Sequence, residues 1–343
     1  MPTALPTTMQ AVRPGSTTIE QVAVPPVPEG FVLVEVERCG ICGSDLHWYH
    51  GAAEPRTVCP GHEIAGIVRG TPPARSGLRD GTRVAIEAIH TCGHCRHCEE
   101  GDRQLCAKLE ILGLHRPGGF ARFVVIHPRH ILALPADLGP AAGALVEPLA
   151  VAMHAVRIAG GIRDRSALIL GAGSLGLLTA YAAREMGAAR TTITARHPHQ
   201  NTAARALGID AVEPPDGASG DWDFVFETVG GPSTSTLDEA LRRVRPGGTV
   251  VLSGLFHAPP QFDALALMSR EIRLCGANCY GTAAGKSDFQ AAADLIARDS
   301  DRLVSSLVTH TVALADFGRA MDIAADKSSG SIKVQVAVAD AAD

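Results

Sequence analysis

The chain has 343 residues, of which 46% are hydrophobic and 20% charged, and its formal net charge is −5. This length is enough for two domains with separate cores, and the charge gives neither a basic footprint for nucleic acid nor an attraction to anionic membranes. No apolar stretch reaches the roughly 20 residues of a transmembrane helix, and Met1–Pro25 lacks the pattern of a secretory signal, so we expect a cytoplasmic protein.

The first part of the chain, up to about residue 135, has the pattern of an all-β domain. Short apolar, β-branched runs alternate with segments rich in Gly and Pro, as in strands joined by turns. The expected strands are Phe31–Glu37, Ile64–Arg69, Thr82–Glu87 and Phe120–His127.

Near residue 140 the pattern changes to alternating helices and strands. Strands are expected at Ala167–Leu170, Thr191–Ala195, Phe224–Glu227, Thr249–Ser253 and Ile272–Cys275. Helices are expected at Ala141–Ala159, from the glycine-rich segment Gly171–Gly176 to Gly187, at Asn201–Leu207 and at Leu237–Val244. This alternation predicts an α/β fold with a doubly wound parallel sheet. The tail is expected to hold helices at Asp288–Ala297 and Asp316–Ala325 and a strand at Ile332–Val338.

Nine cysteines, an odd number in a chain without a signal peptide, argue against a disulfide framework. Four of them, Cys92, Cys95, Cys98 and Cys106, lie within fifteen residues. Four thiolates at short spacings can wrap one Zn²⁺ in a closed, structural site. Two alternatives remain open: four unrelated core cysteines, or an iron–sulfur cluster, because the first three cysteines also suit a cluster.

A second group of metal-ligand residue types is dispersed along the chain. Cys42 lies in Cys-Gly-Ser-Asp-Leu-His, His62 and Glu63 in Gly-His-Glu, and Glu147 in Glu-Pro-Leu. Each motif alone is weak evidence. Cys39 and Cys42 also have the spacing of a redox pair, although no thioredoxin-type βαβ unit surrounds them, and Asp45 is expected to cap backbone amides.

With these motifs in this order, the chain resembles the zinc-containing medium-chain alcohol dehydrogenases, close to the sorbitol and threonine dehydrogenase branch. The resemblance implies a GroES-like catalytic domain, residues 1–150 with 285–343 returning to it, and a Rossmann domain, residues 151–284. It also implies that Cys42, His62 and Glu63 ligate a catalytic zinc, and that Glu147 is a fourth ligand or holds the zinc-bound water. Ser44 and His47 would carry the hydroxyl proton to solvent, and the enzyme would be a homodimer or homotetramer.

The glycine-rich turn Gly171-Ala-Gly173-Ser174-Leu175-Gly176 follows an expected strand and opens an expected helix. In this context the motif predicts a dinucleotide-binding site, with the pyrophosphate at the helix N-terminus. Thr228, after another strand, is expected to face the cofactor.

The second strand of this domain ends at Ala195 and is followed by Arg196, without the acid that usually binds the ribose 2′-hydroxyl of NAD. An arginine there would pair with a 2′-phosphate. The sequence therefore favours NADP, with NAD possible, and a one-residue shift of register would change this interpretation.

Together these features predict a zinc-dependent oxidoreductase with one catalytic and one structural zinc per chain. It would transfer hydride between NADP or NAD and a secondary alcohol or the corresponding ketone, with a polyol, cyclitol or sugar as substrate. Two alternatives are a nucleotide-binding protein that has lost catalysis and a zinc-independent reductase of the same superfamily.

Overall fold

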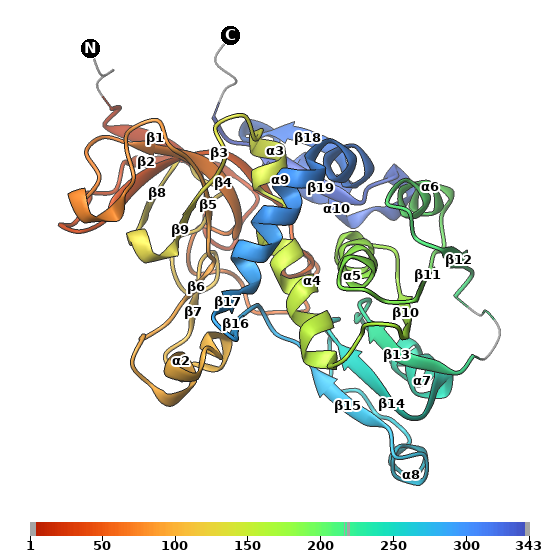
Figure 1. Ribbon diagram of the computed structural model, residues 1–343. Coiled ribbons are helices and arrows are strands. Elements are labelled where there is room, and N and C mark those ends of the chain that lie inside the picture. Colours follow the sequence, from red (N-terminus) through yellow and green to blue (C-terminus); the bar gives the residue numbers. More distant parts are fainter. Residues whose placement is uncertain (1–4, 216, 218–219, 340–343) are drawn as a thin grey trace. The chain divides into compact units, whose positions relative to one another are not determined.

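The computed structural model describes residues 5–215, 217 and 220–339, and the chain divides into two compact units (Figure 1). The first comprises Met1–Glu147 and Gly281–Asp343, and the second comprises Pro148–Tyr280. The chain therefore leaves the first unit once and returns to it.

The first unit is built mainly on antiparallel strands, as the alternating apolar runs predict, and β18 pairs parallel with β19. Its main sheet contains β3 (Val32–Gly40), β4 (Glu63–Arg69), β5 (Arg83–Ile86), β8 (Phe123–Ile126), β9 (Ile131–Ala133), β18 (Val308–Ala313) and β19 (Lys333–Ala337). The order is β18-β19-β3-β4-β5-β9, with β8 also paired to β3. Strands from both ends of the sequence thus lie side by side, and β19 pairs antiparallel with β3.

Smaller elements complete the first unit. They are the strand pairs β1 (Thr8–Val12) with β2 (Ile19–Ala23), β6 (Ile89–His90) with β7 (Glu110–Ile111) and β16 (Thr282–Ala283) with β17 (Lys286–Ser287); the helices α1 (Gly43–Tyr49), α2 (Arg96–Glu100), α3 (Pro140–Gly143), α9 (Asp288–Leu307) and α10 (Phe317–Ala325); and the 3₁₀ turns Ala74–Ser76, Arg103–Leu105, Pro128–His130, Leu314–Asp316 and Lys327–Ser329. The core packs Val34, Ile64, Phe120, Phe317 and Val336.

The second unit is the predicted doubly wound sheet. It contains β10 (Ser166–Leu170), β11 (Arg190–Thr194), β12 (Ala211–Glu213), β13 (Trp222–Glu227), β14 (Val244–Leu252) and β15 (Arg273–Gly276), with the helices α4 (Val146–Ala159), which begins at the unit boundary, α5 (Ser174–Glu185), α6 (Pro198–Ala206), α7 (Ser235–Arg243) and α8 (Ala264–Ser269). All described pairs in this sheet are parallel, in the order β12-β11-β10-β13-β14-β15. This is the strand order of dinucleotide-binding folds, whose switch point lies between the first and fourth strands.

Three predictions from the sequence were wrong in detail. The helix expected at Asp288–Ala297 continues to Leu307, because a non-helical residue, Asp299, only interrupts it and Leu303 and Leu307 beyond it are buried. The strand Val308–Ala313 was missed because it alternates polar and apolar residues over a short length. The all-β interpretation also overlooked the short helix Gly43–Tyr49.

The apolar segment Pro140–Ala159 also corrects the sequence analysis, which found no stretch long enough to span a membrane. Its 20 residues meet that criterion by length and composition, but 72% of the window is buried inside the protein. Such burial is typical of a core helix.

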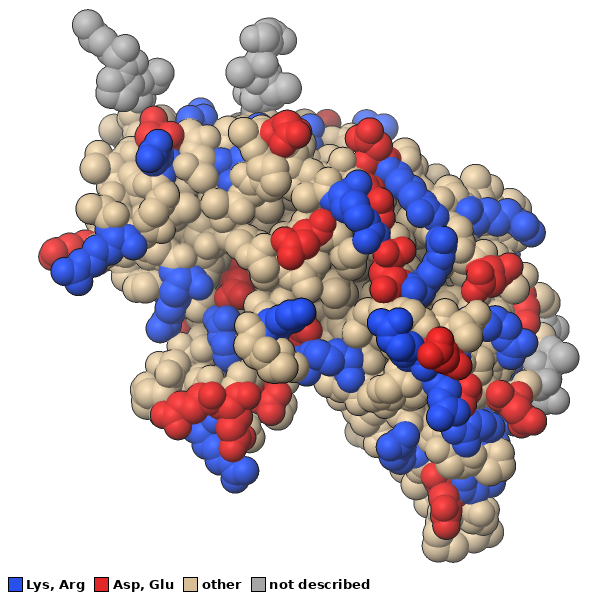
Figure 2. Space-filling view, in the orientation of Figure 1, with Lys and Arg blue, Asp and Glu red and all other residues tan. Residues whose placement is uncertain are grey.

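On the face shown in Figure 2, basic and acidic side chains are interspersed.

Candidate active site

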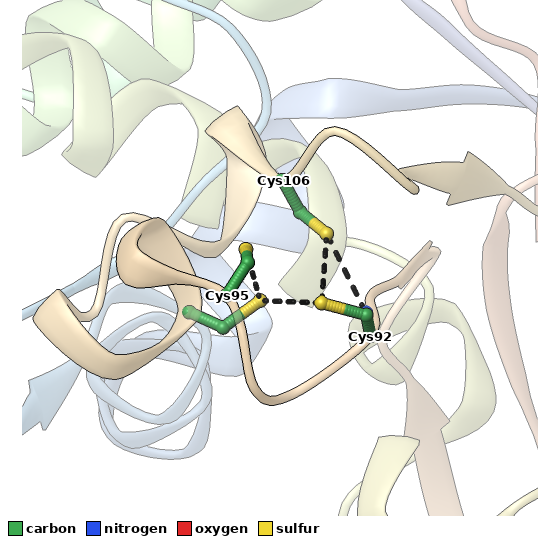
Figure 3. A group of neighbouring side chains, drawn as sticks. Cys92, Cys95 and Cys106 are labelled. Atoms are coloured by element: carbon green, nitrogen blue, oxygen red, sulfur yellow. Dashed lines mark hydrogen bonds between the residues drawn. The ribbon is translucent and has the colours of Figure 1, made fainter.

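The four clustered cysteines converge as their spacing predicts (Figure 3). The Sγ atoms of Cys95 and Cys98 are 3.5 Å apart, those of Cys92 and Cys106 3.6 Å, and those of Cys92 and Cys98 3.9 Å. Four sulfurs at about 2.3 Å from one tetrahedral Zn²⁺ would be about 3.8 Å apart. The geometry therefore fits a single metal ion.

Backbone groups already favour thiolates in this loop. The amide of Cys92 donates to the Cys106 sulfur at 3.4 Å, and the amide of Lys108 donates to it at 3.3 Å. The backbone amide of His94 is the main cause that lowers the pKa of Cys92 to about 6. His94 and His97 are exposed, and His94 Nδ1 contacts the Cys92 carbonyl at 2.8 Å, so neither histidine is needed as a ligand.

Cys42 and His62 meet in the first unit. Cys42 precedes α1, and its amide donates to the Asp45 carboxylate at 3.0 Å, which confirms Asp45 as a capping residue. Burial would lower the pKa of His62, but the negative charge and hydrogen bond of Cys42 raise it to about 10. The buried Nδ1 of His62 has no hydrogen-bond partner. A sulfur donor of a half-buried cysteine thus lies beside a nitrogen donor of a buried histidine.

Glu63 has a partner that the sequence analysis missed. Lys333 Nζ lies 2.6 Å and 2.7 Å from the two carboxylate oxygens of Glu63 and donates to the carbonyl of Ile41 at 3.0 Å. Both side chains are buried, with exposed fractions of 3% and 1%. Burial alone would lower the pKa of Lys333, but Glu63 and then Cys42 raise it above its ordinary value. The one available signal was a lysine inside an apolar strand.

Glu147 brings a second carboxyl to this region from the first turn of α4. Burial raises its pKa to about 7, and the nearby charge of His62 opposes this shift. A buried carboxyl of this kind is favoured when a cation lies against it.

The dispersed donors suit Zn²⁺ by chemistry: one thiolate, one imidazole and one carboxylate are the ligand types of catalytic zinc sites. The Nδ1 atom of His62 is buried without a hydrogen-bond partner, and a bound metal ion would satisfy it. The fit by distance is less complete. Among the described residues, the group of possible ligands whose atoms all lie within 4.8 Å of one another is that of the four clustered cysteines, and it does not include Cys42, His62, Glu63 or Glu147. The Glu63 carboxylate is instead bound by Lys333.

Ser44 and His47 follow Cys42 on α1, so the same helix carries both residues expected in proton transfer. The Ser44 hydroxyl is buried and without a hydrogen-bond partner, while its carbonyl accepts from Arg56 at 2.9 Å. Cys39, the other member of the supposed redox pair, is buried in the core, and burial raises its thiol pKa well above the ordinary value. Cys39 is therefore a packing residue.

The glycine-rich turn of the second unit connects β10 to α5, as predicted. Gly171 has φ = +99°, and a Cβ on Gly176 would lie 1.8 Å from the Gly171 carbonyl oxygen. A Cβ on Gly173 would meet no atom within 4 Å. The first and third glycines therefore allow the turn to close, and the second leaves open space beside the helix N-terminus, where a phosphate can approach the backbone.

Hydrogen bonds to neighbouring strand ends hold this turn. The Gly171 amide donates to Thr194 Oγ1 at 2.9 Å, and Thr228 Oγ1 donates to the Leu170 carbonyl at 2.7 Å. The Glu227 carboxylate accepts from the Gly230 amide at 2.8 Å and so shapes the loop that contains Thr228. Ser174 Oγ is buried without a partner at the start of α5.

At the end of β11, Ala195 is buried and Arg196 is exposed. The amides of Arg196 and His197 both donate to Gln200 Oε1, which fixes the start of α6. The amide of Ala195 bonds to the carbonyl of Glu213 on β12, but the Glu213 carboxylate is paired with Arg243 at 2.6 Å. This acid is therefore neutralised within the protein.

The whole chain is similar to known dehydrogenases. Residues 28–136 match the alcohol dehydrogenase GroES-like domain, and residues 140–338 match the glucose dehydrogenase C-terminus. The 2-dehydro-3-deoxy-L-galactonate 5-dehydrogenase of Pseudoalteromonas atlantica is 32% identical over 306 residues, which are 85% of this chain and 87% of that relative.

Two crystal structures are also similar. L-Idonate 5-dehydrogenase from Escherichia coli K-12 has a TM-score of 0.85 at 27% identity, over 96% of this chain and 98% of that chain. A protein from Sinorhizobium meliloti 1021, described as a zinc-binding dehydrogenase bound to NADP, has a TM-score of 0.84 at 30% identity, over 96% of this chain and 99% of that chain.

Proposed function

Because the chain belongs to the zinc-containing medium-chain alcohol dehydrogenase family, we propose that it catalyses hydride transfer between a secondary alcohol and a nicotinamide cofactor. The resemblance predicted from the motifs, the GroES-like and Rossmann fold class and the dehydrogenase activity are confirmed.

Cys42 and His62 would hold the catalytic zinc, and carboxylates from Glu147 and Glu63 would complete or adjoin its ligand set. When bound, zinc would supply a Lewis acid that lowers the pKa of a hydroxyl placed against it, and the nicotinamide would accept hydride. Asp45 fixes the backbone at Cys42. Burial of His62 and Glu147 keeps water away and strengthens every charge interaction there.

Ser44 would accept the hydroxyl proton of the substrate, and His47 would pass it towards solvent. The support is geometric: both lie on α1 directly after Cys42, and the Ser44 hydroxyl is buried without a partner. Proton transfer by a positioned side chain is ordinary general acid–base catalysis.

We propose NADP as the preferred cofactor. The pyrophosphate would lie at Gly173, Ser174 and Leu175, at the N-terminus of α5, with Thr228 on the adjoining loop. Arg196 is exposed beside Ala195, where a positive charge can pair with a 2′-phosphate, and the nearby Glu213 carboxylate is bound to Arg243. The relative from Sinorhizobium meliloti has bound NADP.

A sugar acid or polyol is the proposed substrate class. By their names, two relatives act on such molecules, 2-dehydro-3-deoxy-L-galactonate and L-idonate. We also propose one catalytic and one structural zinc per chain, a homodimer or homotetramer, and a cytoplasmic location, which would keep the four clustered cysteines reduced.

The observation that carries the proposal is the side-chain contact of Cys42 with the buried His62. The test measures zinc per chain and oxidation of a panel of polyols and sugar acids, with NADP and NAD compared side by side. We expect two zincs, and we expect Cys42→Ser to lose one zinc together with activity. Full activity of Cys42→Ser would exclude the zinc-dependent mechanism. It would favour the alternative of a zinc-independent reductase.

A further inference from the structure

Arg56 is a half-buried arginine that no carboxylate of the described residues neutralises. It lies in the loop between α1 and β4, within the first unit. Three other half-buried arginines of this unit each bind a carboxylate, at 2.7 to 3.1 Å: Arg69, Arg83 and Arg103. A guanidinium is charged at every physiological pH, so Arg56 keeps a positive charge that these contacts do not compensate.

The guanidinium of Arg56 also has unused hydrogen-bond donors. It carries five N–H groups, and among the described residues one acceptor is found for them, the carbonyl of Ser44, which lies 2.9 Å from Nη2. The Nε atom is buried and has no hydrogen-bond partner. A buried donor without an acceptor costs free energy, so native proteins seldom leave one unless a ligand or water completes it.

This guanidinium lies beside the residues assigned to the chemistry. Ser44 follows Cys42 by one residue on α1, and the Cys42 side chain bonds with that of His62. The Ser44 hydroxyl and His62 Nδ1 are also buried without hydrogen-bond partners. Polar groups that converge in one part of a fold and lack partners there indicate the place of a polar ligand.

The two proposed substrate classes differ in the group that Arg56 would meet. A polyol ends in a neutral hydroxymethyl group, whereas a sugar acid with the same carbon chain ends in a carboxylate. The planar guanidinium matches a carboxylate with two parallel N–H···O bonds. A carboxylate would therefore supply both the missing negative charge and the missing acceptors, and a hydroxymethyl group would supply no charge.

We propose that Arg56 binds the carboxylate of the substrate while the reacting hydroxyl lies at Ser44, so that the enzyme prefers sugar acids to polyols. This inference rests on the proposed function and narrows its substrate class. The bond between Arg56 and the Ser44 carbonyl fixes the acid-binding group relative to the proposed proton acceptor. It therefore also sets how far the reacting hydroxyl lies from the carboxylate.

The experiment compares the parent enzyme with Arg56→Met and Arg56→Lys. Arg75→Met, at an exposed arginine of the same unit, is the control for the loss of one positive charge. The substrates are six-carbon aldonates and the alditols of matching configuration, such as D-gluconate with D-glucitol, together with alditol phosphates. Each is supplied with saturating NADP and, separately, NAD, and kcat, KM, zinc per chain and Tm are measured.

The parent should have a kcat/KM at least tenfold higher for aldonates than for the matched alditols. Arg56→Met should lose about 10- to 100-fold in kcat/KM for aldonates, as expected when hydrogen bonds to a charged group are removed. The loss should appear mainly in KM, because the carboxylate is bound equally in the ground and transition states. Values for alditols should change less than about twofold, Arg56→Lys should lose less than Arg56→Met, and Arg75→Met should match the parent.

Equal losses with aldonates and alditols in Arg56→Met would overturn the inference, because Arg56 would then only hold α1 through the Ser44 carbonyl. A parent that prefers alditols or alditol phosphates would also overturn it and leave hydride transfer standing. This comparison within the parent and the Arg56→Lys variant remain decisive if Arg56→Met does not fold. If the parent oxidises no member of the panel with either cofactor, the proposed function itself fails.

Discussion

The glycines of the cofactor turn offer a pair of matched substitutions, Gly173→Ala and Gly176→Ala, that separate folding from cofactor binding. The added methyl group is the same in both. At Gly176 the new Cβ would lie 1.8 Å from the Gly171 carbonyl oxygen and 2.8 Å from Thr228 Oγ1, whereas at Gly173 it would meet no protein atom within 4 Å. Ordinary contacts are longer than about 3.4 Å, so Gly176→Ala must move the turn by more than an ångström.

Overpacking of this kind costs about 1–3 kcal/mol, and the backbone oxygen places Gly176→Ala at about 3 kcal/mol. At roughly 2–4 °C per kcal/mol for a unit of this size, its Tm should fall by about 6–12 °C. Gly173 has φ = −77° and ψ = −177°, which any residue adopts, so Gly173→Ala should change the Tm by less than about 2 °C.

For cofactor binding, the substitution expected to have the clear effect is Gly173→Ala. The methyl group at Gly173 fills the space beside the helix N-terminus, so a bound pyrophosphate would lose one or two hydrogen bonds, worth about 1.5–3 kcal/mol, which corresponds to a roughly 10- to 100-fold higher Kd. Thermal unfolding followed by circular dichroism and titration with NADPH by fluorescence measure the two effects. A Gly173→Ala variant that binds NADPH as tightly as the parent would refute the assignment of the pyrophosphate site, and a Gly176→Ala variant as stable as the parent would refute the steric argument.

Three further predictions concern the other sites. Cys98→Ser should remove one zinc and lower the Tm, because a four-thiolate site contributes its binding energy to folding; two zincs found by metal analysis would contradict this. Ser44→Ala should lower kcat by about 10²–10⁴-fold with both zincs retained, and an unchanged kcat would exclude Ser44 from proton transfer. Arg196→Ala should lower kcat/KM by roughly tenfold with NADP and leave it unchanged with NAD, because an exposed guanidinium pairs with a 2′-phosphate at the lower end of the usual range; equal losses with both cofactors would mean that Arg196 does not read the 2′-position.

Local patterns were sufficient where one segment carries the whole signal. The apolar run Ala167–Leu170 followed by three spaced glycines predicts a strand, a tight turn and a helix, and the structure has them at β10 and α5. The four-cysteine cluster is likewise contained in one loop, and its sulfurs converge. In both cases a short stretch of chain determines the geometry, so spacing alone is informative.

Segments whose structure depends on tertiary contacts were harder to predict. The continuation of α9 beyond Asp299 depends on burial of Leu303 and Leu307, which a polar interruption conceals in the sequence. The apolar segment Pro140–Ala159 has the length and composition of a membrane span, and only its burial identifies it as a core helix. Hydropathy alone cannot distinguish these two environments, because both exclude water.

The partners of charged residues in the candidate metal site were also not predictable from the sequence, because they come from distant strands. Gly-His-Glu places His62 and Glu63 next to each other in sequence, but His62 precedes β4 and Glu63 begins it. Glu63 meets Lys333 because β3 lies between β4 and β19 in the sheet, and Lys333 is 270 residues away in the sequence. A motif specifies which possible metal ligands are present. Whether a ligand is already paired with another charge depends on which residues the fold places beside it. Residue-by-residue transfer of ligand roles within a family should therefore be checked against the cations that share the sheet with them.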